Sequence, residues 1–135
     1  MRRRLAAAVA ATLVVAAGCT GSDDATSIRL VVPDKNIREE GVECAGARPF
    51  EHVHAGAEYA VEDRDGTVVA DGELPAGRAE NAEPEIDWEV ERIPTFCVVE
   101  LEVDVPKGSR YRFRVGDSLP LEFVPGDEQV VLVVR

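Results

Sequence analysis

The chain has 135 residues and a formal net charge of −11, with 26 acidic and 15 basic side chains. This length is enough for one domain with its own core and not for two. The surplus of negative charge repels the phosphates of nucleic acids and of anionic lipid headgroups, which argues against a nucleic-acid-binding function.

The N-terminus has the pattern of a secretory signal. Arg2–Arg4 precede an apolar run, Leu5–Ala17, which is shorter than the roughly 20 residues that a membrane-spanning helix needs. The run ends at Ala16-Ala17-Gly18-Cys19, which resembles the lipobox of bacterial lipoproteins. In that motif the cysteine receives a diacylglyceryl group and becomes the first residue of the mature chain.

We therefore predict a lipoprotein signal peptide over residues 1–18 and lipidation of Cys19. Two acyl chains, at about 0.8 kcal/mol per buried methylene, give a lasting membrane anchor where one chain would not. Cleavage would change the net charge from −11 to −14, because it removes three arginines and no acid. The expected location is the outer face of the cell membrane; soluble secretion after a plain cut near Ala17 is the alternative.

The rest of the chain divides into a short tether and one domain. Residues 19–27 are predicted to form a flexible tether, because the residues that follow Cys19 in this segment are small and polar. Residues 28–135 contain short segments in which apolar and polar side chains alternate, separated by turn residues. We predict an all-β domain, an antiparallel two-sheet β-sandwich with the general architecture of immunoglobulin and transthyretin domains.

The first predicted strand is Ile28–Val32, which ends at Pro33-Asp34. A hairpin follows further along: Tyr59 and Val61 lead into Asp63-Arg64-Asp65-Gly66, and Thr67–Val69 leaves it. An Asp-Gly pair between apolar runs favours a tight turn between antiparallel strands.

Later segments are shorter. Residues 76–84 are predicted to form a long surface loop, and Ile86, Trp88 and Val90 a strand after it. Further strands are predicted where Leu119, Leu121 and Phe123 alternate and in the apolar run Val130–Val134.

The most regular alternation runs over Cys97–Val105 and Tyr111–Val115, on either side of the turn residues 106–109. We predict that these strands pair as a hairpin, with Leu101 opposite Phe113 in the core. On the outer face the same register opposes acids to arginines: Glu100 to Arg114, Glu102 to Arg112 and Asp104 to Arg110. The arginine row is interpreted as a solvated face matched by acids rather than as a ligand site.

Cys97 belongs to the inward-facing set, and export would place it in an oxidising compartment. We predict a disulfide with Cys44, and the chain-entropy model assigns the closure of this loop about 4 kcal/mol. A catalytic cysteine is the rival interpretation, which the surrounding valines and acids disfavour. If Cys44 and Cys97 pair, lipidation accounts for the third cysteine, Cys19.

A set of residues spread over roughly 42–135 adds a resemblance. The set consists of Cys44-Ala45-Gly46, Phe50, His52-Val53, Gly56, Asp65-Gly66, Leu74–Gly77, Cys97, Val103, Val105-Pro106 and Tyr111. Together they resemble a family of uncharacterised exported proteins and lipoproteins of high-GC Gram-positive bacteria. The resemblance implies a compact β domain with a Cys44–Cys97 bridge and no known enzyme activity. Phe50 and His52 stand where that family has tyrosine and aspartate, so no role of that aspartate is carried over.

The chain has two histidines, His52 and His54, at positions i and i+2. On a strand both imidazoles would point to one face. With a carboxylate from Glu51 or Glu58 they would offer nitrogen and oxygen ligands to zinc or copper, and a metal-binding envelope protein is therefore an alternative function. Surface histidines beside an acid are the simpler interpretation.

The densest acidic run lies between Glu80 and Glu91. It lacks the spaced Asp-x-Asp-x-Asp-Gly order of a calcium loop and is interpreted as a solvated face. Because the sequence has no Gly-x-Ser-x-Gly elbow, a small secreted hydrolase is only a second alternative. We expect a non-enzymatic binding module without a cofactor. Besides the membrane that holds its lipid, its expected partner is an envelope protein or a small-molecule ligand.

Overall fold

A computed structural model describes residues 25–34, 36–82, 89 and 94–135 of the chain. The predicted all-β class is confirmed, because every regular element in these residues is a strand. The strands are β1 (Ala25–Pro33), β2 (Glu43–Cys44), β3 (Glu58–Glu62), β4 (Val68–Glu73), β5 (Gly77–Asn81), β6 (Thr95–Asp104), β7 (Tyr111–Val115), β8 (Leu121–Phe123) and β9 (Val130–Val133). None of the described residues belongs to a helix that would be long and apolar enough to cross a membrane.

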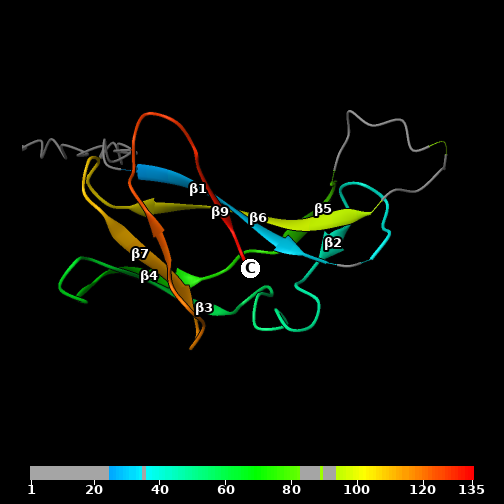
Figure 1. Ribbon diagram of the computed structural model, residues 1–135, viewed down its shortest axis with the longest axis horizontal. Coiled ribbons are helices and arrows are strands. Elements are labelled where there is room, and N and C mark those ends of the chain that lie inside the picture. The colour runs from blue at the N-terminus through cyan, green and yellow to red at the C-terminus, as the bar shows by residue number, and fades with distance from the viewer. Residues whose placement is uncertain (1–24, 35, 83–88, 90–93) are drawn as a thin grey trace, which may run out of the picture.

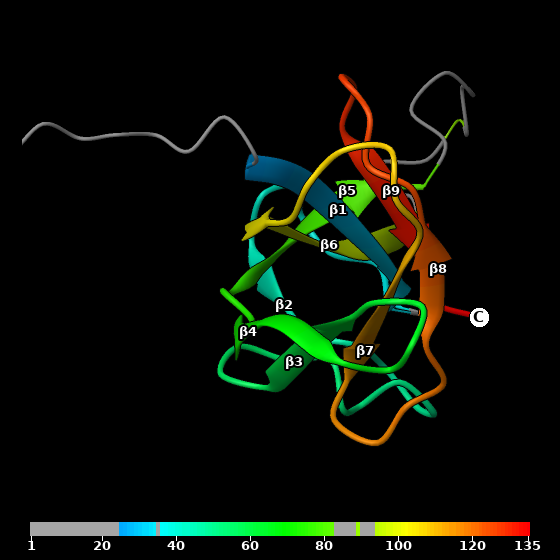
Figure 2. The same cartoon turned by 90° about the vertical axis from the view of Figure 1, so that its left-hand side faces the viewer.

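The strands form two sheets that pack face to face (Figures 1 and 2). The five-stranded sheet has the order β2-β5-β6-β1-β9, and the four-stranded sheet has the order β4-β3-β7-β8. All neighbouring strands are antiparallel except β1 and β9, which run parallel. The predicted two-sheet β-sandwich is therefore confirmed, with one parallel pair at the edge.

The core lies between the sheets and follows from the two-residue period of the strands. In β1, Ile28, Leu30 and Val32 are fully buried, while the residues between them are only partly covered. From the opposite sheet, Phe113 of β7 is fully buried, and its ring stacks on Tyr59 of β3 at a centroid distance of 5.3 Å. Alternation thus assigns each side chain to the core or to the surface.

β1 begins at Ala25 rather than at the predicted Ile28. The polar residues at its start are held by side-chain hydrogen bonds: Thr26 Oγ1 donates to the carbonyl of Val105 (3.4 Å), and Ser27 Oγ accepts from Gln129 Nε2 (3.0 Å). Residues 25–27, which were predicted as tether, therefore belong to the strand. Cys19 and the rest of the tether lie outside the described residues.

The strand ends at Pro33, as predicted. Beyond it, the carboxylate of Asp34 is buried and accepts hydrogen bonds from Asn36 Nδ2 (2.8 Å) and Arg38 Nε (2.6 Å). A buried carboxylate is tolerated when donors satisfy it, so this short-range network fixes the turn out of β1.

The predicted hairpin of Cys97–Val105 with Tyr111–Val115 is wrong. β6 lies between β5 and β1, whereas β7 lies between β3 and β8 in the other sheet. Residues 105–110 therefore carry the chain across the sandwich, and Glu100 faces Arg29 of β1 instead of Arg114. The reason is that alternation specifies which face of a strand is buried but not which strand lies beside it.

The predicted surface loop over residues 76–84 is also wrong in part, because Gly77–Asn81 forms β5 between β2 and β6. Its inward-facing residues, Gly77 and Ala79, are both buried. Their side chains are too small to give an apolar alternation in the sequence. The predicted strand with Ile86, Trp88 and Val90 lies outside the described residues.

The predicted Asp-Gly hairpin is confirmed between β3 and β4. Asp63 Oδ1 accepts hydrogen bonds from the backbone N–H groups of Asp65 and Thr67, both at 2.9 Å. Gly66 has φ of 84°, a conformation that other residues rarely adopt. The last two predicted strands are confirmed as β8, which begins at Leu121, and β9.

Candidate functional sites

Cys44 of β2 and Cys97 of β6 form the predicted disulfide, with their Cα atoms 5.7 Å apart. Both residues are buried, and the bridge passes Gly77 of β5, which pairs with Cys44. A Cβ built on Gly77 would come within 2.5 Å of Cys97 Sγ, so the bridge needs glycine at this position. The two sulfurs thus have a structural role rather than that of a catalytic thiol.

His52 and His54 lie in the loop between β2 and β3, so the strand on which they would share one face is not formed. His54 is exposed and its Nδ1 lies 2.9 Å from the carbonyl oxygen of Ala55. Glu51 pairs with Arg48 at 3.8 Å, and Glu58 is the first residue of β3. Within the described residues, no three His, Cys, Asp or Glu side chains are grouped so as to hold a metal ion.

The arginine row, which consists of Arg110 before β7 and of Arg112 and Arg114 within it, is matched by acids, as expected, but by different ones. Glu62 of β3 accepts a hydrogen bond from Arg114 (2.8 Å) and lies 3.4 Å from Arg112, while Arg110 pairs with Glu122 of β8 at 3.2 Å. These pairs lie within the four-stranded sheet, because β7 neighbours β3 and β8.

An apolar pocket of about 230 Å³ opens between the two sheets. Leu30, Val53 and Phe113, which line it, have at most 1% of their surface exposed to water. Leu119, also part of the lining, is 86% exposed. The pocket is therefore open to solvent beside Leu119, while Leu30, Val53 and Phe113 form a closed floor that belongs to the core. The polar side chains of its lining are those of His52, Ser118 and Arg135.

Two turns with internal hydrogen bonds border this pocket. In the first, the N–H of Gly46 donates to the carbonyl of Val53 (2.8 Å) and the N–H of Val53 to the carbonyl of Phe50 (3.0 Å). In the second, the N–H of Val115 donates to Ser118 Oγ at 3.3 Å. The pocket was not predicted, because its lining residues come from segments far apart in the sequence.

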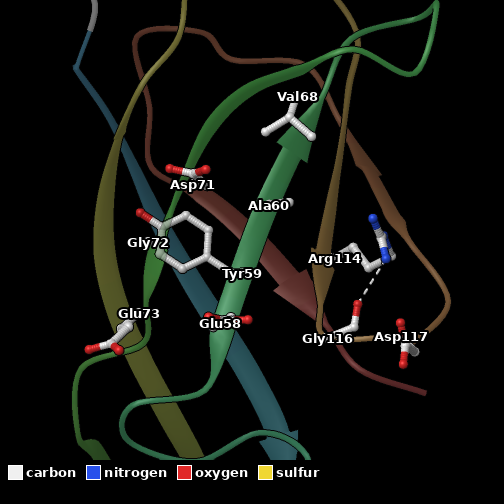
Figure 3. A pocket seen from close by; sticks show the side chains of 10 residues that line it. All are labelled: Glu58, Tyr59, Ala60, Val68, Asp71, Gly72, Glu73, Arg114, Gly116 and Asp117. Atoms are coloured by element: carbon white, nitrogen blue, oxygen red, sulfur yellow. Dashed lines mark hydrogen bonds between the residues drawn. The ribbon is translucent and has the colours of Figure 1, made fainter.

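A second, shallower hollow of about 540 Å³ lies beside β4, the edge strand of the four-stranded sheet (Figure 3). Four carboxylates belong to its lining, those of Glu58, Asp71, Glu73 and Asp117. Figure 3 shows the ring of Tyr59 beside Gly72, and Arg114, which donates to the carbonyl of Gly116 (3.0 Å), on the other side of β3.

The electrostatics of this acidic hollow affect Tyr59. Burial, and to a smaller extent the negative charge of Asp71, raise the pKa of the Tyr59 phenol above its ordinary value of 10.0. A surface with this surplus of carboxylates attracts cations. The hollow was not predicted from the sequence, because its acids come from two strands and the turn after a third.

No protein-family model, curated protein or solved structure matches the chain. The function is therefore inferred from the geometry of the two hollows and from the N-terminal sequence.

Proposed function

We propose that the protein is a lipid-anchored, extracytoplasmic binding module that takes a small apolar group into the pocket between its sheets. The observation that carries this proposal is the apolar lining of the pocket: its accessible wall is formed by the exposed Leu119 and the partly buried Phe50, Leu121 and Val134. An apolar group that covers these side chains removes their exposed apolar surface and its own from water, which contributes about 25 cal/mol per Å² of buried surface.

The composition of the pocket supports a binding role. Ligand sites are mostly apolar with a few polar groups that orient the ligand, and here His52, Ser118 and Arg135 would orient it. The volume of about 230 Å³ is below the roughly 300–1,000 Å³ of pockets for drug-sized molecules. The occupant is therefore a short alkyl or aromatic group, carried by a small molecule or by a side chain of an envelope protein.

The anchor would keep the domain close to the membrane. Residues 20–24 separate Cys19 from the start of β1 at Ala25, a distance of at most about 20 Å when stretched. Val134 of the pocket lining lies toward the other end of β1, because its N–H donates to the carbonyl of Val31 (3.0 Å). The pocket would thus lie toward the end of β1 that is opposite to the anchor. The Cys44–Cys97 disulfide is consistent with an oxidising extracytoplasmic location.

The proposed role is non-enzymatic. Among the described residues, no serine is hydrogen-bonded to His52 or His54. A nucleophile positioned by a neighbouring base is what a small hydrolase of this kind requires.

The test is methyl NMR of the chain from Thr20 with hexan-1-ol and with indole as probes. Saturable shifts of the methyl signals of Leu30, Val53 and Leu121 are expected, since these residues line the pocket. Leu119→Trp adds bulk at the mouth and should weaken binding. Its control is Val124→Trp, because Val124 is also exposed (53%) but does not line the pocket. The absence of saturable shifts with both probes would contradict the proposal.

A further inference from the structure

We propose that the free edge of β4, together with the acidic hollow beside it, docks an extended basic segment of a partner protein as an additional strand of the four-stranded sheet. This site is separate from the apolar pocket and does not depend on it. Strand addition to an exposed sheet edge is a common mode of peptide recognition, in which backbone hydrogen bonds supply affinity and side-chain contacts supply specificity.

The backbone of β4 is available for such a strand. β4 pairs with β3, and in the described part of the chain no other strand pairs with it. The N–H of Leu74 donates to the carbonyl of Ala57 (2.8 Å), so by antiparallel alternation Gly72 and Ala70 also face β3. The N–H and C=O groups of Asp71 and Glu73 consequently point away from the sheet, where a further strand would bond to them.

The side chains at this edge select a basic segment. Glu73 of β4 lies directly opposite Glu58 of β3, and like charges in this position repel each other. Four carboxylates line the hollow, and within the described residues none of them has an ion-pair partner: Glu58, Asp71, Glu73 and Asp117. A lysine or arginine placed between them would relieve the repulsion that the free protein contains.

The hollow lies on the outer face of the sheet over Ala60 of β3, and a long side chain of an added strand would reach it across β4. Ala60 lies opposite Asp71, and its small side chain leaves the hollow open across β3. The ring of Tyr59 lies against Gly72, where a Cβ would be 3.0 Å from Tyr59 Oη, so β4 has no side chain at this position on the face that packs toward the core. A second copy of the chain is disfavoured as the occupant, because its own β4 would bring Asp71 and Glu73 against the same acids.

The experiment uses the full-length chain in a neutral detergent and a fluorescein-labelled peptide of four Lys-Thr repeats. We expect saturable binding by fluorescence anisotropy, and slower amide hydrogen exchange at Asp71 and Glu73. The Asp71→Asn/Glu73→Gln double variant should bind about fivefold more weakly, the loss expected for two exposed ion pairs. The control is Glu102→Gln/Glu128→Gln, which removes the same charge from exposed positions outside the hollow.

Asp71→Pro tests strand addition itself. The N–H that it removes points away from β3, and proline is tolerated at such positions of edge strands. This variant should bind the peptide more weakly than Asp71→Asn does, with an unchanged melting temperature as evidence of folding. The proposal is overturned if the control double variant loses as much affinity as Asp71→Asn/Glu73→Gln, if a Glu-Thr peptide binds equally well, or if exchange does not slow in β4.

Discussion

Gly77 lies against the disulfide so closely that any side chain at this position would overlap the sulfur of Cys97: a Cβ there would be 2.5 Å from Sγ and 3.1 Å from the carbonyl oxygen of Cys44. Gly77→Ala should therefore lower the free energy of unfolding of the oxidised protein by about 1–3 kcal/mol, the usual cost of overpacking. The control is Gly126→Ala, where the added methyl meets nothing within 4 Å and the change should stay within about 0.5 kcal/mol. Equal urea-unfolding curves for the two variants would contradict this relationship.

The bridge itself joins residues 53 positions apart, and a loop of this length predicts a stabilisation of about 4 kcal/mol. The Cys44→Ala/Cys97→Ala double variant should lose roughly this free energy of unfolding. In that background the cost of Gly77→Ala should shrink, because residues in contact are energetically coupled. A double-mutant cycle by chemical denaturation measures the coupling, and strict additivity would show that the methyl does not act through the sulfur.

Tyr59 should titrate above its ordinary pKa of 10.0. Burial is the larger cause and the Asp71 carboxylate the smaller, so Asp71→Asn should lower the pKa of Tyr59 without restoring the ordinary value. The folded state favours the neutral phenol, so stability is unaffected well below pH 10 and falls as the pH rises from about 10 through the folded-state pKa. Tyrosinate absorbance measured in a Tyr111→Phe background reports Tyr59 alone; a midpoint at or below 10 would refute the expectation.

Asp63 ties the turn between β3 and β4 through two backbone N–H groups, those of Asp65 and Thr67. Asp63→Ala should lower the free energy of unfolding by about 1–2 kcal/mol, because exposed hydrogen bonds of this kind contribute about 0.5–1.5 kcal/mol each. Asp65→Ala is the matched control: it removes a neighbouring carboxylate but leaves both hydrogen bonds in place. The melting temperatures of the two variants are compared by thermal unfolding. Similar values would argue against the role of the Asp63 carboxylate in stabilising the turn.

Glu73 faces Glu58 across the β3–β4 pair. Glu73→Lys replaces this repulsion with an attraction and should raise the free energy of unfolding by about 0.2–1 kcal/mol. The same variant should weaken binding of the Lys-Thr peptide by about fivefold, so stability and binding should move in opposite directions. Glu102→Lys serves as the control for net charge, and a stabilisation of equal size there would attribute the effect to overall charge instead.

Local chemistry explains what could be predicted from the sequence. The Asp63–Gly66 turn was predicted correctly because its hydrogen bonds and its positive φ involve residues within five positions of one another. The burial of Cys97 was likewise predicted from the alternation of β6, and the disulfide followed from the small number of cysteines.

Neighbour relationships between strands could not be predicted in the same way. Leu101 and Phe113 both face inward, yet they lie on different sheets, since amphipathic strands fit a hairpin and a sandwich equally well. β5 was missed because Gly77 and Ala79 fill the core with backbone and a methyl group rather than with large side chains. Both hollows depend on such long-range neighbours, and neither was predicted from the sequence.

The most direct test of the central claim, an exported domain held by a lipid at Cys19 and closed by a Cys44–Cys97 bridge, is intact-mass spectrometry. The protein would be purified, without reducing agent, from the membranes of a bacterium that expresses the full chain. The expected mass corresponds to a chain that begins at Cys19, carries a diacylglyceryl group and has no free thiol. An unmodified N-terminus, or free thiols at Cys44 and Cys97, would contradict the claim.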